Sequence, residues 1–302
     1  MVDSVMKRLR INWPGICCIT ILSLSVIVTS KCMVLIRSEL LIRDVILRDI
    51  NYYEFRNIRI DKAKLDKVQE YTHNLIMSYD YIESHPYIDE TGYLTYAMML
   101  SEYNMLDNAV PNEKLFLRGI GRVSKTNAFL ELYSYYKGIF SDIRYFPIPL
   151  MGKDAHGVSY EDSWNARRSY GGNRKHEGTD IMAGNNIRGY FPIISITDGI
   201  VEKMGWLEQG GYRIGIRSKA GAYFYYAHLD TYAPELKIGD SVTAGQLLGF
   251  MGDSGYGSEG TIGQFDVHLH LGIYVPSESC EISVNPYWIL RILENCRTQP
   301  VY

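Results

Sequence analysis

The stretch Val267-His-Leu-His-Leu-Gly-Ile-Tyr-Val275 alternates apolar side chains with polar or small ones. Period-two alternation is typical of a β-strand that buries one face. On such a strand His268 and His270 lie on the same face, with Cα atoms about 6.6 Å apart. Two half-buried structural histidines are the simpler interpretation, but protonated imidazoles without an acidic partner in the strand would repel each other. The stretch therefore predicts a strand that carries a functional histidine pair.

Other short β-branched and aromatic runs surround this strand, and glycines separate them, as at Gly210-Gly211 and Gly252-Asp-Ser-Gly255. Such runs between tight turns indicate a mostly antiparallel β domain. We place this domain at residues 147–290, because the sequence pattern changes at Phe146-Pro-Ile-Pro149 from helical spacing to short β-branched and aromatic runs. The expected strands are Ile193–Ile196, Ile200–Met204, Tyr212–Arg217, Tyr223–His228, Gln246–Met251 and Val267–Val275.

A second motif, His176-Glu-Gly-Thr-Asp180, precedes most of these runs. On a straight strand the first and last residues would be about 13 Å apart, which is too far for one metal ion. Gly178 allows the chain to bend and bring imidazole and carboxylate together. A helix would also do so, but Gly178, Thr179 and Ile181 are poor helix formers. By itself this spacing is a weak indication of a metal site.

His228 ends the run Tyr225-Tyr-Ala-His228, where a lone histidine is usually structural. Taken together, however, His176, Asp180 and one of His268 and His270 supply two nitrogens and one carboxylate. Catalytic zinc prefers three such ligands with the fourth position open to water. A closed structural zinc site would need thiolates, and magnesium or calcium would need more oxygen ligands. The remaining histidines, expected at the surface, are His73, His85 and His156.

The motifs occur together in an order that is similar to the lysostaphin/LytM-type zinc metallopeptidases, which cut peptidoglycan peptides. The resemblance covers residues 147–290, about half of the chain. The matching segments are Ser169-Tyr-Gly-Gly172 with His176-Glu-Gly-Thr-Asp180, Tyr226-Ala-His-Leu229, Val242-Thr-Ala-Gly-Gln-Leu-Leu-Gly249 with Gly252-Asp-Ser-Gly255, and His268-Leu-His-Leu271.

The resemblance implies a role for each matching residue. His176, Asp180 and His270 would be zinc ligands, while His228 and His268 would polarise the attacking water and stabilise the oxyanion. Zinc would lower the pKa of bound water toward about 7, and a neutral imidazole would accept the proton. The expected function is therefore zinc-dependent hydrolysis of peptide bonds in bacterial cell-wall peptidoglycan.

The sequence departs from the family pattern at two places, a conservative apolar change and a loop that would border the substrate groove. Leu271 replaces the usual phenylalanine, and a longer loop, Tyr256–Asp266, precedes the second metal motif. Because this loop would border the groove, the substrate specificity stays open. The sequence does not decide between a glycine bridge and a direct peptide. A zinc-binding but non-catalytic envelope scaffold, as in division or sporulation complexes, is the alternative function. A serine or cysteine hydrolase is excluded, because the chain has no G-x-S-x-G motif and neither Cys280 nor Cys296 has catalytic context.

The N-terminus indicates an extracytoplasmic protein. Residues 1–13 carry three basic side chains, and an uncharged stretch from Pro14 to Ser30 follows, continued after Lys31 by Cys32–Ile36. This predicts a cytoplasmic N-terminus and a single transmembrane anchor at residues 14–36, with the catalytic domain outside the cell. A cleaved signal peptide and a buried core helix remain alternatives.

Between the anchor and the β domain, residues 37–146 show helical spacing, with turns expected at Asp89–Gly92 and Val110–Asn112. We interpret this region as a helical stalk that docks an envelope partner, and residues 291–302 as a tail. The fold class is thus α+β.

Composition and charge exclude other classes. With 46% hydrophobic and 22% charged residues among 302, the chain is not disordered. A net charge of −3 gives no basic excess for binding nucleic acid. No C-x-x-C pair occurs among the five cysteines, although a bridge between Cys280 and Cys296 remains open.

Overall fold

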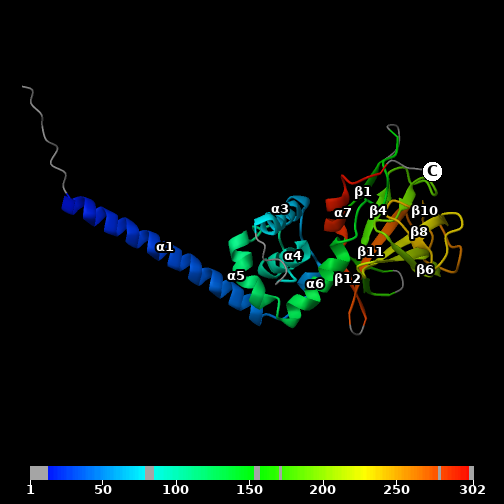
Figure 1. Ribbon diagram of the computed structural model, residues 1–302. Helices are drawn as coiled ribbons and strands as arrows, with labels where there is room; N and C mark the ends of the chain where they lie inside the picture. The colour runs from blue at the N-terminus through cyan, green and yellow to red at the C-terminus, as the bar shows by residue number, and fades with distance from the viewer. Residues whose placement is uncertain (1–12, 79–84, 153–156, 170–171, 278–279, 299–302) are drawn as a thin grey trace, which may run out of the picture. The chain divides into compact units, whose positions relative to one another are not determined.

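The computed structural model describes residues 13–78, 85–152, 157–169, 172–277 and 280–298 (Figure 1). His156, residues 1–12 and part of the Ser169–Gly172 segment lie outside this range. The chain forms two compact units, Met1–Leu47 and Arg48–Tyr302. The predicted domain boundaries within residues 37–302 stay predictions.

The first unit contains one helix, α1 (Trp13–Leu47). Within the described residues it is the one helix long and apolar enough to cross a membrane, a test that signal sequences and core helices also pass. Two of its threonine hydroxyls are satisfied inside the helix, since Thr20 Oγ1 and Thr29 Oγ1 donate to the carbonyls of Cys17 and Ser25 at 2.8 Å. The helix extends past the expected span of 14–36.

The second unit begins with a helical part, as predicted: α2 (Tyr52–Arg56), α3 (Lys62–Ser78), α4 (Glu90–Leu100), α5 (Glu113–Val123) and α6 (Asn127–Phe140). The expected turn at Asp89–Gly92 is wrong. Asp89 is instead the N-cap of α4, because its carboxylate accepts a hydrogen bond from the Gly92 N–H at 2.6 Å. Aromatic side chains fill the core here: Tyr93 stacks on Phe116 at 4.2 Å, and its hydroxyl donates to the Pro111 carbonyl.

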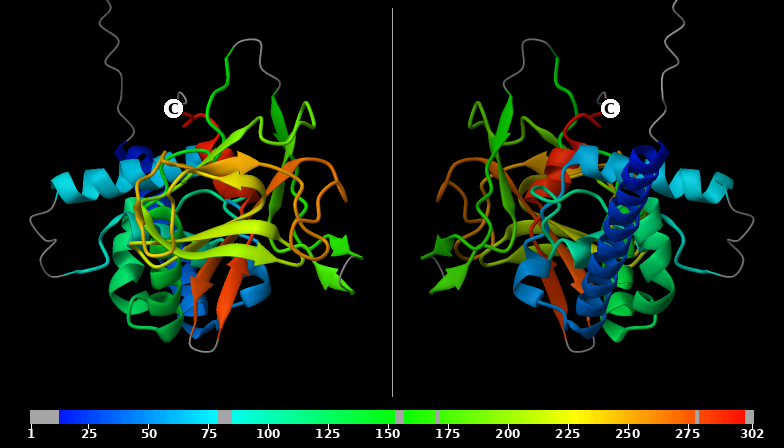
Figure 2. Two further views of the ribbon diagram at one scale, coloured as in Figure 1. Left: turned by 90° about the vertical axis from the view of Figure 1, so that its right-hand side faces the viewer. Right: turned by 90° about the vertical axis from the view of Figure 1, so that its left-hand side faces the viewer.

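The strands form a largely antiparallel sheet in the order β1-β4-β11-β8-β7-β6-β9, with β10 beside β5 and β8, β12 beside β11, and β2 and β3 as a separate hairpin (Figures 1 and 2). The α+β class is confirmed. The strand bounds are β1 Val158–Tyr160, β2 Arg167–Arg168, β3 Arg174–Lys175, β4 Thr179–Ala183, β5 Pro192–Ile194, β6 Gly199–Leu207, β7 Gly211–Ser218, β8 Tyr223–Tyr232, β9 Ser241–Val242, β10 Leu247–Met251, β11 His268–Pro276 and β12 Glu281–Val284. The helix α7 (Tyr287–Leu293) follows.

The two faces of the central strands differ in chemistry. On β11, Leu269, Leu271 and Ile273 are fully buried in the core, whereas the alternate positions carry His268 and His270. This alternation is the one that the sequence predicts, and it places the histidine pair on the face of the sheet opposite the core.

The helical part and the sheet are joined by a buried asparagine. Asn285, fully buried after β12, donates from its backbone N–H to the Arg56 carbonyl at 2.7 Å. Its side-chain amide donates to Asn57 and to Asp162 at 3.0 Å each. No disulfide bridge joins Cys280 and Cys296 in the described structure. The segment that ends in β12 is held to the sheet by the pairing of β12 with β11.

Candidate metal centre

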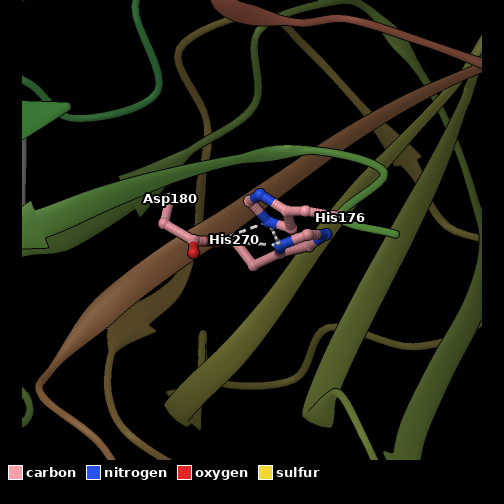
Figure 3. Close-up of side chains that lie close together, drawn as sticks. All are labelled: His176, Asp180 and His270. Carbon is pink, nitrogen blue, oxygen red and sulfur yellow. Dashed lines mark hydrogen bonds and ion pairs between the residues drawn. The ribbon is translucent and has the colours of Figure 1, made fainter. Parts of the chain in front are cut away.

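Strand pairing brings the two metal motifs together. Asp180 on β4 is the direct cross-strand partner of His270 on β11, so their side chains share one face. His176 lies immediately after β3, and the short segment between β3 and β4 turns its imidazole toward the same point. Figure 3 shows the three side chains converging.

The ligating atoms are about one hydrogen bond apart. Asp180 Oδ1 lies 3.1 Å from His176 Nε2 and 2.9 Å from His270 Nδ1. The two nitrogens lie 3.0 Å from each other. His176 is 2% exposed, and the side chains of Asp180 and His270 are each 15% exposed, so the cluster is reached from one side only.

His176 and Asp180 each contact a second group, on the side away from the cluster, that the sequence analysis did not identify. His176 Nδ1 lies 3.0 Å from the Ser163 hydroxyl and 3.1 Å from the Ser163 carbonyl oxygen. In the tautomer that donates from Nδ1 to this carbonyl, Nε2 has a lone pair for a metal ion. The guanidinium of Arg168 donates to Asp180 Oδ2, leaving Oδ1 toward the histidines. Backbone carbonyls carry no sequence signal, and Arg168 lies on a hairpin whose position depends on the whole fold.

Gly178 has a different role from the expected one. It is not among the residues with positive φ, so left-handed backbone does not explain it. A Cβ at this position would lie 2.4 Å from His270 Cε1 and 2.6 Å from the Leu271 carbonyl oxygen. Gly178 is therefore needed for space beside the His270 ring.

The donor set fits zinc. Two imidazole nitrogens and one carboxylate oxygen, in the only described group of this kind, match the three-ligand pattern of catalytic zinc. Ligands of a tetrahedral zinc at about 2.0–2.1 Å are about 3.3 Å apart, close to the spacing found here. Two unprotonated nitrogens in contact would repel each other, and a divalent cation between them removes that repulsion.

Electrostatics favour the ligating protonation states. Burial opposes the charge of Asp180, but its close contacts with the imidazoles of His176 and His270 outweigh that effect and hold its pKa far below the ordinary value. Burial lowers the pKa of His270, although the hydrogen bond to Asp180 acts in the opposite direction. Both groups are thus ready to bind a cation at neutral pH.

His228 and His268 lie beside the cluster, with ring centroids 4.7 Å apart. Each Nδ1 lies 2.7 Å from a backbone carbonyl, that of Ser254 for His228 and that of Asp266 for His268. Because a carbonyl only accepts, both Nδ1 atoms carry the proton and both Nε2 atoms are free to accept one. Burial, with the nearby charges of His268 and His270, lowers the pKa of His228 well below its ordinary value.

A backbone irregularity aims His228 into the site. Its φ is +62°, in the left-handed region, and the register between β7 and β8 shifts beside it. The backbone N–H still donates to the Gly210 carbonyl at 2.8 Å. Bulges of this kind redirect a side chain, which explains how a strand-end histidine joins the pair on β11.

A groove of about 720 Å³ runs over the cluster. The long loop Tyr256–Asp266 contributes to it, since Tyr256 and Phe265 line the groove and pack at ring distances of 6.2 and 4.6 Å from His228. The structure thus brings all five predicted site residues to one groove. His73 and His85 are not among its lining residues.

The chain is similar to known proteins over the part that contains this groove. The model of peptidase family M23 matches residues 174–286, which include all five site residues. A crystal structure of a lytM protein from Ruminococcus gnavus matches with a TM-score of 0.66 and 43% identity, covering 82% of this chain and 93% of that chain. Residues 147–302 are only about half of the chain, whereas the match covers 82% of it. The similarity therefore includes helices that precede the sheet.

Two curated relatives match over shorter parts. The L-Ala–D-Glu endopeptidase of Bacillus subtilis is 40% identical over 171 residues, which are 57% of this chain and 50% of that protein. The glycyl-glycine endopeptidase ALE-1 of Staphylococcus capitis is 34% identical over 151 residues, which are 46% of this chain and 38% of that protein. The chain thus spans half or less of the length of these relatives.

Proposed function

The chain belongs to peptidase family M23, and from this premise we propose that it is a zinc-dependent endopeptidase that hydrolyses peptide bonds in bacterial cell-wall peptidoglycan. One observation carries the proposal above all. The ligand set of His176, Asp180 and His270 is complete, and two further histidines face the same groove with free Nε2 atoms. A protein that only bound zinc would have no use for that second pair.

The ligands would be His176 Nε2, Asp180 Oδ1 and His270 Nδ1. Bound there, zinc polarises the scissile carbonyl and lowers the pKa of water to about 7. Asp180 keeps its charge because Arg168 and the histidines stabilise the carboxylate.

His268 acts as the general base. Its Nδ1–H is fixed on the Asp266 carbonyl, so the lone pair of Nε2 accepts the proton of the attacking water. The same nitrogen then returns the proton to the leaving amine. The Asp266 carbonyl also stabilises the imidazolium that forms between these two steps.

His228 orients the attacking water. To stabilise an oxyanion, its Nε2 would need a second proton, which burial and the neighbouring histidines disfavour. As a neutral acceptor it holds one hydrogen of the water while His268 takes the other. This division of work gives each histidine of the pair a distinct role.

The apolar helix α1 anchors the enzyme in the cell membrane, with the N-terminus inside and the unit Arg48–Tyr302 outside. Support comes from its length and composition and from the extracellular position of the substrate. N-terminal sequencing of the membrane-bound protein tests this proposal, since a cleaved signal peptide would remove the helix. Docking of an envelope protein by residues 37–146 remains a prediction.

The activity is tested by zymography on purified cell walls with the full chain in detergent micelles and one equivalent of zinc. We expect clearing that disappears with a chelator and returns with added zinc. Zinc binding without clearing, on walls of several peptide chemistries, would instead support the non-catalytic scaffold.

A further inference from the structure

The acidic side chains of the catalytic groove are all neutralised by arginines. Each of the three carboxylates lining the groove makes an ion pair, so none of them is left to attract a cationic ligand. The pairs are Arg56 with Glu177, Arg168 with Asp180, and Arg217 with Glu281.

Basic side chains in the same groove are left without such partners. Arg213 on β7 and Lys203 on β6 line the groove, and neither forms an ion pair with a described residue. The Nη1 atom of Arg213 is buried and has no hydrogen-bond partner within the described ranges. A buried guanidinium nitrogen without a partner is costly, so a turn of the side chain that brings Nη1 to a ligand in the groove is favourable.

The register of the sheet places Arg213 near the metal ligands. Tyr225 on β8 pairs with Gly272 of β11 on one side and with Gly215 of β7 on the other. Arg213 is therefore two strands from the His268–His270 pair, about 10 Å across the sheet. An extended peptide covers that distance in about three residues.

The space between Arg213 and the metal ligands is lined by tyrosine. The ring of Tyr225 lies 6.0 Å from that of His270, and Tyr225 also lines the groove. This gives the peptide an aromatic surface beside the scissile bond and a cationic group beyond it. An arginine that shares a groove with tyrosine rings suits bidentate binding of a carboxylate.

We propose that Arg213 is the specificity residue of this groove and binds a free carboxylate of the substrate within about three residues of the scissile bond. The inference rests on the proposed peptidase function and narrows it. It favours an L-Ala–D-Glu bond over a glycyl-glycine bond, because glutamate has two carboxyl groups and keeps one free when the other forms a peptide bond. A glycine bridge offers no such group.

The test uses the full chain in detergent micelles with zinc and three synthetic peptides. One contains L-Ala–D-Glu with the second glutamate carboxylate free, one has that carboxylate amidated, and one is pentaglycine. We expect amidation to raise KM for the wild type about 10- to 100-fold with little change in kcat, as the loss of a charge-assisted hydrogen bond predicts. Arg213→Gln should raise KM for the free-carboxylate peptide by the same factor.

The effects of peptide amidation and of Arg213→Gln on KM should not be additive. In Arg213→Gln, amidation should have almost no further effect, whereas Arg213→Lys should keep part of the discrimination. Arg144→Gln is the matched control, since Arg144 is 60% exposed and does not line the groove. If Arg213→Gln weakens cleavage of the free and amidated peptides equally, the residue has only a structural role and the proposal is wrong.

A binding measurement separates this proposal from the proposed function. Fluorescence anisotropy of the labelled free and amidated peptides on zinc-loaded His268→Ala reports recognition without turnover. Tighter binding of the free carboxylate, lost in His268→Ala/Arg213→Gln, supports the subsite even if no peptide is cleaved. Equal binding of both peptides overturns the subsite even if the wild type is an active peptidase.

Discussion

Asp180 is the residue on which the metal centre depends, because its two carboxylate oxygens serve two different functions. Oδ1 lies between His176 and His270, while Oδ2 receives the hydrogen bond from Arg168. In the proposed site the carboxylate would thus be both a ligand and the group that fixes the distance between the two motifs.

Replacing Asp180 with Ala should therefore remove zinc and abolish hydrolysis, since two imidazoles alone hold the metal weakly. Zinc stoichiometry of the purified variant, by atomic absorption, checks this. Asp107→Ala, a change in the loop after α4, is the control and should keep one zinc per chain. A full equivalent of zinc in Asp180→Ala would refute the ligand assignment.

His268→Ala should differ from Asp180→Ala in its zinc content. We expect zinc to remain bound and turnover to fall about 10²- to 10⁴-fold, the usual contribution of a general base. Parallel measurement of kcat and zinc content checks both parts. A metal-free His268→Ala protein would mean that the roles of His268 and His270 are exchanged.

Gly178→Ala tests the space beside His270. Because the added methyl would lie 2.4 Å from His270 Cε1, the ring must move, and zinc affinity should fall about 10- to 100-fold. Competition with a zinc-binding dye measures this. Gly152→Ala is the matched control, since a Cβ there meets nothing within 4 Å. Equal zinc affinity of the two variants would show that the site tolerates the methyl group.

At the scale of elements, the strands with a clear apolar or alternating run were predictable, whereas the shortest ones without such a run were not. The run around His268 and His270 forms β11 as expected, whereas β9 has two residues and β12 has four, too few to show a period. The five histidine and aspartate residues that line the groove could be named from the motifs, but their neighbours Arg168 and Arg213 could not. The positions of these two arginines depend on strand neighbours that only the fold determines.

The short helix α2 connects the helical part, through Arg56, to the segment between β3 and β4 that carries His176. Its guanidinium donates to the Ser283 carbonyl at 2.9 Å and to Glu177, the residue after the ligand His176, at 2.6 Å. It also lies over the Trp164 ring at 5.5 Å. A helix outside the family-matched residues 174–286 therefore supports the catalytic sheet.

Arg56→Ala should destabilise the protein by about 1–3 kcal/mol, because it breaks hydrogen bonds to a carboxylate and to a strand carbonyl. Chemical denaturation of the full chain in micelles measures the change. Arg59→Ala, an exposed position without a side-chain hydrogen bond among the described residues, is the control. If both variants unfold at the same denaturant concentration, Arg56 does not join the two parts.

At the scale of the whole molecule, the helices and the sheet between Arg48 and Tyr302 form one compact unit. Their packing and the 82% coverage by the Ruminococcus gnavus structure indicate that the catalytic groove is built with the helical part in place. A helical stalk that served only as a spacer would not need Asn285 to form hydrogen bonds with both parts. Sequence periodicity could identify these helices but not their docking on the sheet.

Mass spectrometry of the fragments that the full chain releases from purified peptidoglycan tests the proposed activity most directly. With zinc, we expect peptide fragments with new free amino groups, and none from Asp180→Ala or from chelator-treated enzyme until zinc is restored. Release of the same fragments by Asp180→Ala, or no broken peptide bond with the zinc-loaded wild type, would contradict a zinc endopeptidase.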